Sequence, residues 1–329
     1  MSIDLELRSP HYITKKELEE IIFPLGWTTD KRYSSYIWYQ TSNFESTRGA
    51  WLDLRYVENA QYRKTKTIIT SSTNAGRSYE DLEAQNNVLK VLKGHFGGYI
   101  YNTQDGTRNY IFNDIPKLLP LEKAIGFVYI TFSHNIIRAS IIVEEVDERI
   151  IKSDDLYIAS LDKSLLRNNT VIPFLVTSLE TLLKYTFIKY IENDDDAIEQ
   201  IYKKNDRIHY SKLKGLLTGE TSMAEIEAKE FNFQNLSSAH EGYKKYIGID
   251  LFSILNKDIE YEGVSLTFRV VLSEIIEMRH EFIHEGVVNT KLGSKKMKKY
   301  IYFMKEFGSK FIEEFNYKKN LRLDLEELL

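Results

Sequence analysis

The spacing of apolar residues changes near the middle of the chain. Up to about residue 155, short apolar stretches alternate with polar and turn residues, a pattern typical of mixed α and β structure. Beyond that point apolar residues recur every three or four positions, as in helices that bury one face. The pattern therefore predicts an α+β chain, with a mixed domain over residues 1–155 and an all-α helical bundle over residues 156–329.

The first half contains two helix starts that are recognisable from their capping residues. Thr14 with Glu17 forms a capping box for a helix that ends near Phe23, and Ser78 can cap a helix that ends near Lys93. The alternating segments are predicted to be two single strands and two hairpins, namely Tyr33–Thr41, Trp51–Val57, Tyr99–Asn102 with Tyr110–Asn113, and Phe127–Phe132 with Ile136–Val143.

The second half is predicted to be helical throughout. Its first strong helix is expected to begin near Pro173, after a linker that contains Asn168 and Asn169. Weaker helical patterns cover residues 194–205, 206–218, 222–231 and 239–256. Two strong helices close the chain, Val264–Glu285, which Gly286 can end, and Ser294–Phe315.

The composition limits the chemistry. The chain has 43% hydrophobic and 28% charged residues, a globular balance, and it has no cysteine, which excludes disulfides, thiolate zinc sites and cysteine nucleophiles. Its net charge of −4 means that any contact with nucleic acid must come from a local patch. The first residues do not resemble a signal peptide, and no run of about 20 apolar residues suggests a membrane span, so a cytoplasmic protein is expected.

Two interpretations compete for the segment from Arg279 to His284. The first is the H-E-x-x-H pattern of zinc peptidases, in which His280 and His284 bind the metal and Glu281 is the base. The second is R-x4-H, in which Arg279 and His284 act on a phosphate and His280 assists them.

Helical geometry favours the phosphate interpretation. Arg279 falls about 20° from Phe268 around an ideal helix, inside the apolar stripe, where a permanent charge needs an anionic partner. A zinc site gives no reason for that arginine, and the extended zinc pattern would need Gly and His where the chain has Val287 and Thr290. A structural salt bridge between Arg279 and Glu180 is the remaining alternative.

The second half resembles the HEPN family, whose helical bundles include RNA-cleaving toxins and antiviral defence nucleases. The resemblance covers about residues 165–318 and rests on the R-x4-H segment, on a helix similar to the family's first one (Phe174–Leu183) and on the stretch Phe231–Leu236. It implies metal-independent RNA cleavage without a cofactor, with His284 as general acid or base, Arg279 stabilising charge on the phosphate and His280 orienting these groups. It also implies a toxin or phage-defence role, with an antitoxin or regulatory protein as a possible partner and the first half as sensor, regulator or substrate selector.

Two further expectations concern assembly and RNA contact. Residues five apart point about 140° from each other on an ideal helix, so Arg279 and His284 are expected to meet across a homodimer, as the resemblance also implies. A cluster of lysines is expected either to bind RNA or to form a solvated face: Lys295, Lys296, Lys298 and Lys299. A non-catalytic module that binds RNA or protein remains the alternative to an enzyme.

Overall fold

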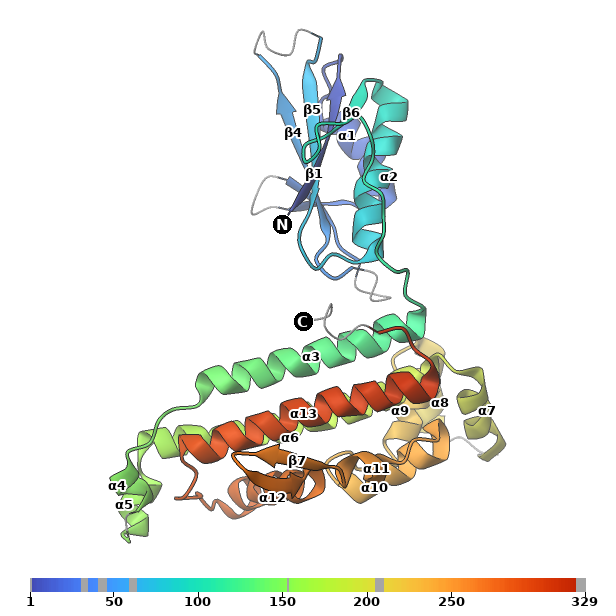
Figure 1. The fold of residues 1–329 in the computed structure, drawn as a ribbon. Coiled ribbons are helices and arrows are strands. Elements are labelled where there is room, and N and C mark those ends of the chain that lie inside the picture. Colours follow the sequence, from blue (N-terminus) through green and yellow to red (C-terminus); the bar gives the residue numbers. More distant parts are fainter. Residues whose placement is uncertain are drawn as a thin grey trace. The chain divides into compact units, whose positions relative to one another are not determined.

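The computed structural model describes residues 2–30, 35–40, 46–58, 64–152, 154–204 and 210–323. The chain is mixed α+β, with 58% of its residues in helices. It divides into two compact units, Met1–Lys123 and Ala124–Leu329, which are coloured blue to green and green to red in Figure 1.

The N-terminal unit is built on an antiparallel sheet. Its described strands are β1 (Ile3–Ser9), β2 (Thr28–Asp30), β3 (Ser35–Trp38), β4 (Ala50–Tyr56), β5 (Thr67–Thr73) and β6 (Tyr99–Asn102), in the order β2-β3-β4-β5-β1-β6. Helices α1 (Lys15–Ile22) and α2 (Tyr79–Phe96) lie on one face of this sheet, and a short 3₁₀ turn, η1 (Phe23–Leu25), follows α1 (Figure 1). Buried residues such as Leu5, Leu7 and Leu89 form the core between them.

Both capping predictions for this unit are confirmed. Thr14 and Glu17 form a capping box at the start of α1, and Ser78 and Asp81 form one at the start of α2. In each case the side chain of the first residue accepts a backbone N–H that the helix itself leaves unpaired. These starts depend only on neighbouring residues, so the sequence alone predicts them well.

The strand predictions are partly correct. The expected strand over Trp51–Val57 is β4, and the core of Tyr33–Thr41 is β3, although residues 33, 34 and 41 lie outside the described residues. The predicted strand Tyr110–Asn113 is wrong. The side chain of Asn86 donates to the carbonyl of Ile111 and accepts from its N–H, so this backbone is paired with a helix side chain and not with a strand.

The C-terminal unit is mainly helical, and its longest helices are α3, α6, α12 and α13. Its described elements are α3 (Pro120–Ile142), α4 (Glu148–Ile151), α5 (Leu156–Ser160), α6 (Lys163–Glu192), α7 (Asp195–Lys204), α8 (Tyr210–Thr218), α9 (Met223–Ala228), α10 (Leu236–Gly242), the π-helical turn η3 (Tyr243–Ile247), α11 (Leu251–Leu255), β7 (Asp258–Tyr261), β8 (Val264–Thr267), α12 (Phe268–His280), the π-helical turn η4 (Glu281–Glu285) and α13 (Ser294–Lys319). Helices α6, α12 and α13 contact one another, and α3 runs along the same bundle (Figure 1).

The predicted hairpin over Phe127–Phe132 and Ile136–Val143 is wrong, because this segment belongs to the single helix α3. The buried residues of α3 recur at helical spacing: Ile125, Val128, Tyr129, Phe132, Ile136 and Ala139. The segment is rich in residues that also favour strands, and packing against other helices decides the outcome. The division between the units consequently falls after Lys123, in the first turn of α3, and not after residue 155.

Two boundaries inside the helical half also differ from the prediction. Helix α6 begins at Lys163, capped by Asp162, so Asn168, Asn169 and Pro173 lie within it and not in a linker or a first turn. The segment expected to start a helix at Val264 is instead strand β8, which pairs with β7 before Thr267 caps α12. The expectation of an all-α second half is therefore wrong, since a small hairpin interrupts it.

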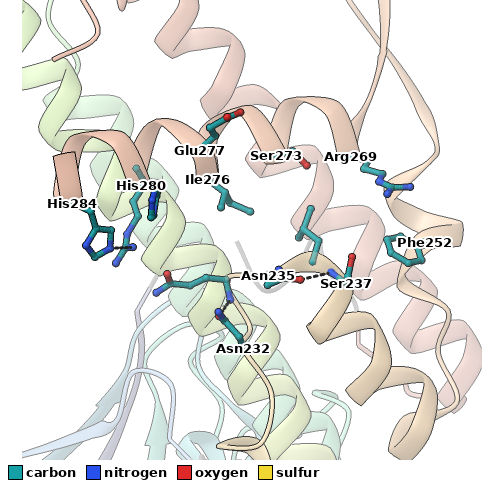
Figure 2. Close-up of a pocket in the computed structure, with 13 residues that line it drawn as sticks. Asn232, Asn235, Ser237, Phe252, Arg269, Ser273, Ile276, Glu277, His280 and His284 are labelled. Carbon is teal, nitrogen blue, oxygen red and sulfur yellow. Dashed lines mark hydrogen bonds between the residues drawn. The ribbon is translucent and has the colours of Figure 1, made fainter. Parts of the chain in front are cut away.

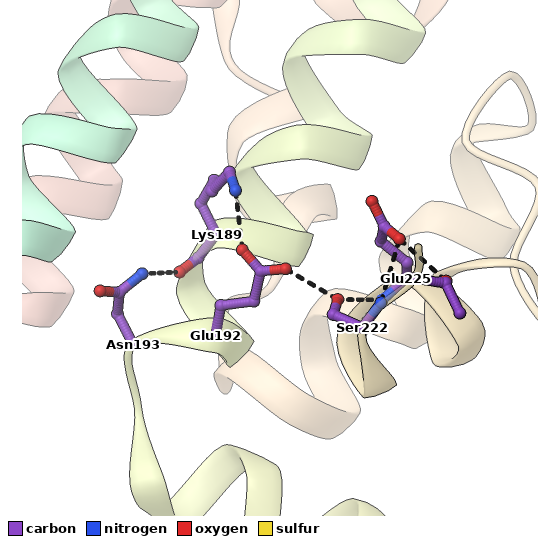
Figure 3. A network of polar contacts seen from close by, with 6 residues as sticks. Lys189, Glu192, Asn193, Ser222 and Glu225 are labelled. Atoms are coloured by element: carbon purple, nitrogen blue, oxygen red, sulfur yellow. Dashed lines mark hydrogen bonds and ion pairs between the residues drawn. The ribbon is translucent and has the colours of Figure 1, made fainter. Parts of the chain in front are cut away.

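A polar network joins the end of α6 to the start of α9, as Figure 3 shows. Glu192 accepts hydrogen bonds from Lys189 Nζ at 2.7 Å and from Ser222 Oγ at 2.7 Å. Ser222 also caps α9 in a reciprocal pair with Glu225. The network gives hydrogen-bond partners to polar groups at the C-terminal end of α6 and at the N-terminal end of α9.

Two helices, α3 and α6, are long and apolar enough to cross a bilayer by length and composition, which the sequence pattern does not predict. In α6, 61% of the most apolar window is buried within the structure, and in α3 39%. Helix α6 contacts α12 and α13, as the core helix of a soluble protein does. The two helices are therefore consistent with a soluble protein.

The close approach of α3 to α13 gives a stability prediction. A Cβ added at Gly308 would overlap the ring of Phe132, so Gly308→Ala should lower the free energy of unfolding by about 1–3 kcal/mol. Gly94→Ala is the control, because a Cβ at this helical glycine meets no atom within 4 Å, and it should be neutral or stabilising. Denaturant unfolding of the full chain measures both, and equal effects would contradict the packing argument.

Candidate active site

Helix α12 carries the predicted site at its C-terminal end, where Arg279 lies within the apolar stripe but is only half-buried and His280 is exposed. Its buried residues pack into the bundle: Phe268, Val271, Leu272, Ile275 and Met278. The exposed polar residues Arg269, Ser273 and His280 consequently face outward along one side of the helix. The apolar period of the sequence therefore determines which side of α12 can carry chemistry.

The end of α12 widens into the π-helical turn η4, Glu281–Glu285. Gly286 closes the turn in the left-handed conformation, with φ of 69°, and its N–H donates to the carbonyl of Glu281, five residues earlier. The N–H of Val287 reaches the same carbonyl at 3.2 Å. Because the bonding step is five residues instead of four, residues five apart lie closer together around the helix axis than in an α-helix, and such turns are frequent at functional sites.

The widened turn brings Arg279 and His284 together in one chain. Arg279 Nη1 lies 3.1 Å from His284 Nε2. A guanidinium can only donate, so this hydrogen bond requires a lone pair on Nε2 and places the proton of the neutral ring on Nδ1. Arg279 and His284 therefore meet within one chain, so the contact that was expected across a homodimer does not need a second copy.

His280 lies beside the same pair. Its ring centroid is 4.9 Å from that of His284, with the planes tilted by 47°. Glu285 Oε1 lies 3.9 Å from His280 Nε2, beyond hydrogen-bond distance. The three residues of the R-x4-H segment singled out by the sequence thus form one cluster, with Arg279 half-buried and both imidazoles exposed.

The cluster opens into a cleft of about 660 Å³. One wall is the outward side of α12, and the facing wall comes from the loop over residues 232–235, from the start of α10 and from Phe252 (Figure 2). The sequence resemblance includes part of this loop, but hydrophobic period does not reveal that it faces α12. The residues that line the cleft are Asn232, Gln234, Asn235, Leu236, Ser237, Phe252, Arg269, Ser273, Ile276, Glu277, Arg279, His280 and His284.

Arg279 has no carboxylate partner within ion-pair distance in the part of the chain that the structure describes. The alternative partner Glu180 instead accepts a hydrogen bond from Gln234 Nε2 at 2.7 Å. The structural salt bridge between Arg279 and Glu180 is thus not formed. The positive charge of Arg279 remains available to an anion that enters the cleft.

The zinc interpretation lacks a ligand set among the described residues. They contain no group of three or more His, Asp or Glu side chains placed to hold a metal ion. Within the described part of the chain, His280 and His284 therefore have no third protein ligand, which a catalytic zinc site requires.

The lysines at the start of α13 lie outside the cleft. Three of them pair with carboxylates at 2.8–2.9 Å: Lys295 with Glu262, Lys296 with Glu274, and Lys298 with Glu145. These pairs are typical of a solvated face. RNA binding by Lys295, Lys296 and Lys299 stays a prediction.

Asn169 positions the chain that follows the site, a role that the sequence does not reveal. Its amide group binds the backbone of Asn289 twice, accepting from the N–H at 2.8 Å and donating to the carbonyl at 3.1 Å. Asn168 binds Glu144 in the same way and also reaches the carbonyl of Leu292. We call these two residues the asparagine clamp. The available signal is that both asparagines occupy the apolar stripe of α6, where a polar side chain needs a buried partner.

Comparisons of the chain with known protein families, with curated proteins and with solved structures find no match. The HEPN resemblance therefore rests on the residues of this chain alone.

The turn that holds His284 can be tested at Gly286. A Cβ there meets no atom within 4 Å, so the only penalty of Gly286→Ala should be the strain of an alanine in the left-handed conformation. This strain should lower the free energy of unfolding by about 1–2 kcal/mol. Asn tolerates this conformation, so Gly286→Asn is the control and should cost less. Hydrogen exchange of the amide at position 286 and unfolding of both variants provide the measurement, and unchanged stability in Gly286→Ala would argue against this turn.

The asparagine clamp gives a separate prediction. Asn169→Ala leaves the backbone N–H and carbonyl of Asn289 without their partner and should lower the free energy of unfolding by about 2–3 kcal/mol. Asn193→Ala removes a single exposed bond to the carbonyl of Lys189 and should cost less than about 1 kcal/mol. Chemical denaturation compares the two, and the clamp is unimportant if their costs are equal.

Proposed function

We propose that this protein is a metal-independent endoribonuclease of HEPN type whose active site is the cluster of Arg279, His280 and His284. The observation that carries the proposal is the 3.1 Å contact between Arg279 Nη1 and His284 Nε2 in an open cleft. An unneutralised guanidinium beside an imidazole is suited to a phosphate that must be held while a proton moves.

The proposed reaction is attack of a ribose 2′-oxygen on the adjacent phosphorus. The N–H of Arg279 moves from His284 Nε2 to a phosphate oxygen as the substrate enters, which frees the lone pair of Nε2. His284 Nε2 then takes the proton of the 2′-hydroxyl as the new P–O2′ bond forms. The P–O5′ bond then breaks, leaving a 2′,3′-cyclic phosphate on one product. Arg279 stabilises the negative charge that the phosphate oxygens gain in the transition state.

The leaving 5′-oxygen must receive a proton to become a hydroxyl. His280 is the nearest further imidazole, with its ring 4.9 Å from that of His284, and it supplies this proton in the proposed scheme. Two imidazoles can thus divide the acid and base steps within one chain. Since the nucleophile is the 2′-hydroxyl, the chemistry is restricted to RNA.

The biological setting follows from the resemblance and is part of the proposal. RNA cleavage of this kind suits a cytoplasmic toxin or antiviral defence enzyme, restrained by an antitoxin or by the N-terminal unit acting as sensor or substrate selector. A homodimer remains part of it, with the exposed apolar side chains Ile283 and Val287, next to His284, as the surface that a second copy would cover. The contact between Arg279 and His284 itself needs only one chain.

The test of the activity is cleavage of single-stranded RNA in EDTA by the full chain. His284→Ala should lower the rate about 10²- to 10⁴-fold and Arg279→Ala about 10²- to 10³-fold, because each loses a group that acts in the transition state. His134→Ala, an exposed histidine on α3, is the matched control and should leave the rate unchanged. Products should carry 2′,3′-cyclic phosphates, and DNA of the same sequence should stay intact.

Two outcomes would defeat the assignment. Abolition of wild-type cleavage by EDTA would favour a metal-dependent reaction. RNA binding without cleavage in the wild-type chain would favour a non-catalytic module.

A further inference from the structure

The cleft holds a second arginine at the end far from the reacting groups. Arg269 lies in the first turn of α12 and lines the same cleft as Arg279. The two are ten residues apart, which corresponds to about 15 Å along the helix. Ser273 and Ile276 lie between them on the same side of α12, so the cleft follows the helix from one arginine to the other.

The guanidinium of Arg269 is held by aromatic stacking and not by an acid. Its Cζ lies 4.9 Å from the ring centroid of Phe252, and the ring of His240 stacks against that of Phe252 at 4.3 Å with the planes 30° apart. Among the described residues, no carboxylate lies within ion-pair distance of Arg269. Stacking fixes the position of the side chain and leaves its charge uncompensated.

The facing wall presents neutral polar groups. Asn232 and Asn235 in the loop before α10, and Ser237 in its first turn, lie opposite α12, as Figure 2 shows. Glu277, the one carboxylate among the described residues that line the cleft, points away from Asn232 in the same view. The cleft therefore combines a cation at each end with amides and a hydroxyl between them.

From this arrangement we propose that Arg269 binds a second phosphate of a single-stranded RNA that lies along α12, while Arg279 and His284 hold the phosphate to be cleaved. This subsite rests on the proposed ribonuclease function and adds its substrate class. At a rise of about 3.4 Å per nucleotide in a stacked strand, the two arginines are spaced for phosphates roughly four nucleotides apart, and fewer in a more extended strand. A duplex is disfavoured because the amides opposite α12 are placed to meet unpaired bases.

The test measures binding of non-cleavable 2′-O-methyl RNA to the full chain by fluorescence polarisation. Two lengths are compared, about twelve nucleotides, which spans both arginines, and about three, which does not. Arg269→Gln should weaken binding of the longer strand about five- to tenfold, lower its salt dependence by about one phosphate contact, and leave the shorter strand unchanged. Arg269→Lys keeps the charge and should retain most of the affinity.

Arg138→Ala is the matched control, since it removes an exposed arginine from α3, outside the cleft. The subsite is refuted if Arg269→Gln behaves like this control, if both lengths lose affinity equally, or if the wild-type chain does not bind the longer strand. Failure of the proposed reaction is recognised separately. In that case the binding differences persist while unmodified RNA stays uncut in EDTA.

Discussion

The hydrogen bond from the N–H of Gly286 to the carbonyl of Glu281 sets the geometry of the candidate site. An α-helix that continued past His280 would turn the side chains of Arg279 and His284 about 140° apart. Lengthening the bonding step to five residues adds backbone to the last turn, and both side chains then point into one cleft. The left-handed glycine makes this closure possible, because a side chain at that position would raise its energy. The same constraint removes the need for a second chain to complete the pair.

The wide turn is kept in place by contacts from a distant part of the sequence. Asn169, in the buried stripe of α6, binds the backbone of Asn289, which is 120 positions away. Its neighbour Asn168 holds Glu144 and Leu292, so the asparagine clamp fixes two connecting segments against one helix. A buried side-chain amide can hydrogen-bond both an N–H and a carbonyl of a loop backbone, and it stabilises the loop without apolar contact. The site is thus a short exposed segment that is held in place by contacts to the buried helices of the bundle.

Charge is distributed so that attraction for an anion is local. The chain as a whole carries a net charge of −4, and the lysines of α13 that pair with glutamates contribute little to an attractive field. Arg269 and Arg279 are different, because Arg269 stacks on the ring of Phe252 and Arg279 contacts the imidazole of His284. A protein can therefore be acidic overall and still offer a phosphate two uncompensated cations.

Features that depend on neighbouring residues were determined by the sequence itself. The capping boxes at Thr14 and Ser78, the apolar stripe of α12 and the choice of Arg279, His280 and His284 as candidates all follow from local spacing. The π-helical turn that brings Arg279 and His284 together in one chain does not. Tertiary structure alone decided that residues 120–142 form a helix, that Val264–Thr267 pairs as a strand, and that Asn232 and Phe252 face α12 across the cleft. Each of these outcomes depends on contacts between segments far apart in the chain. The energy of such contacts exceeds the small local preferences that a sequence pattern records.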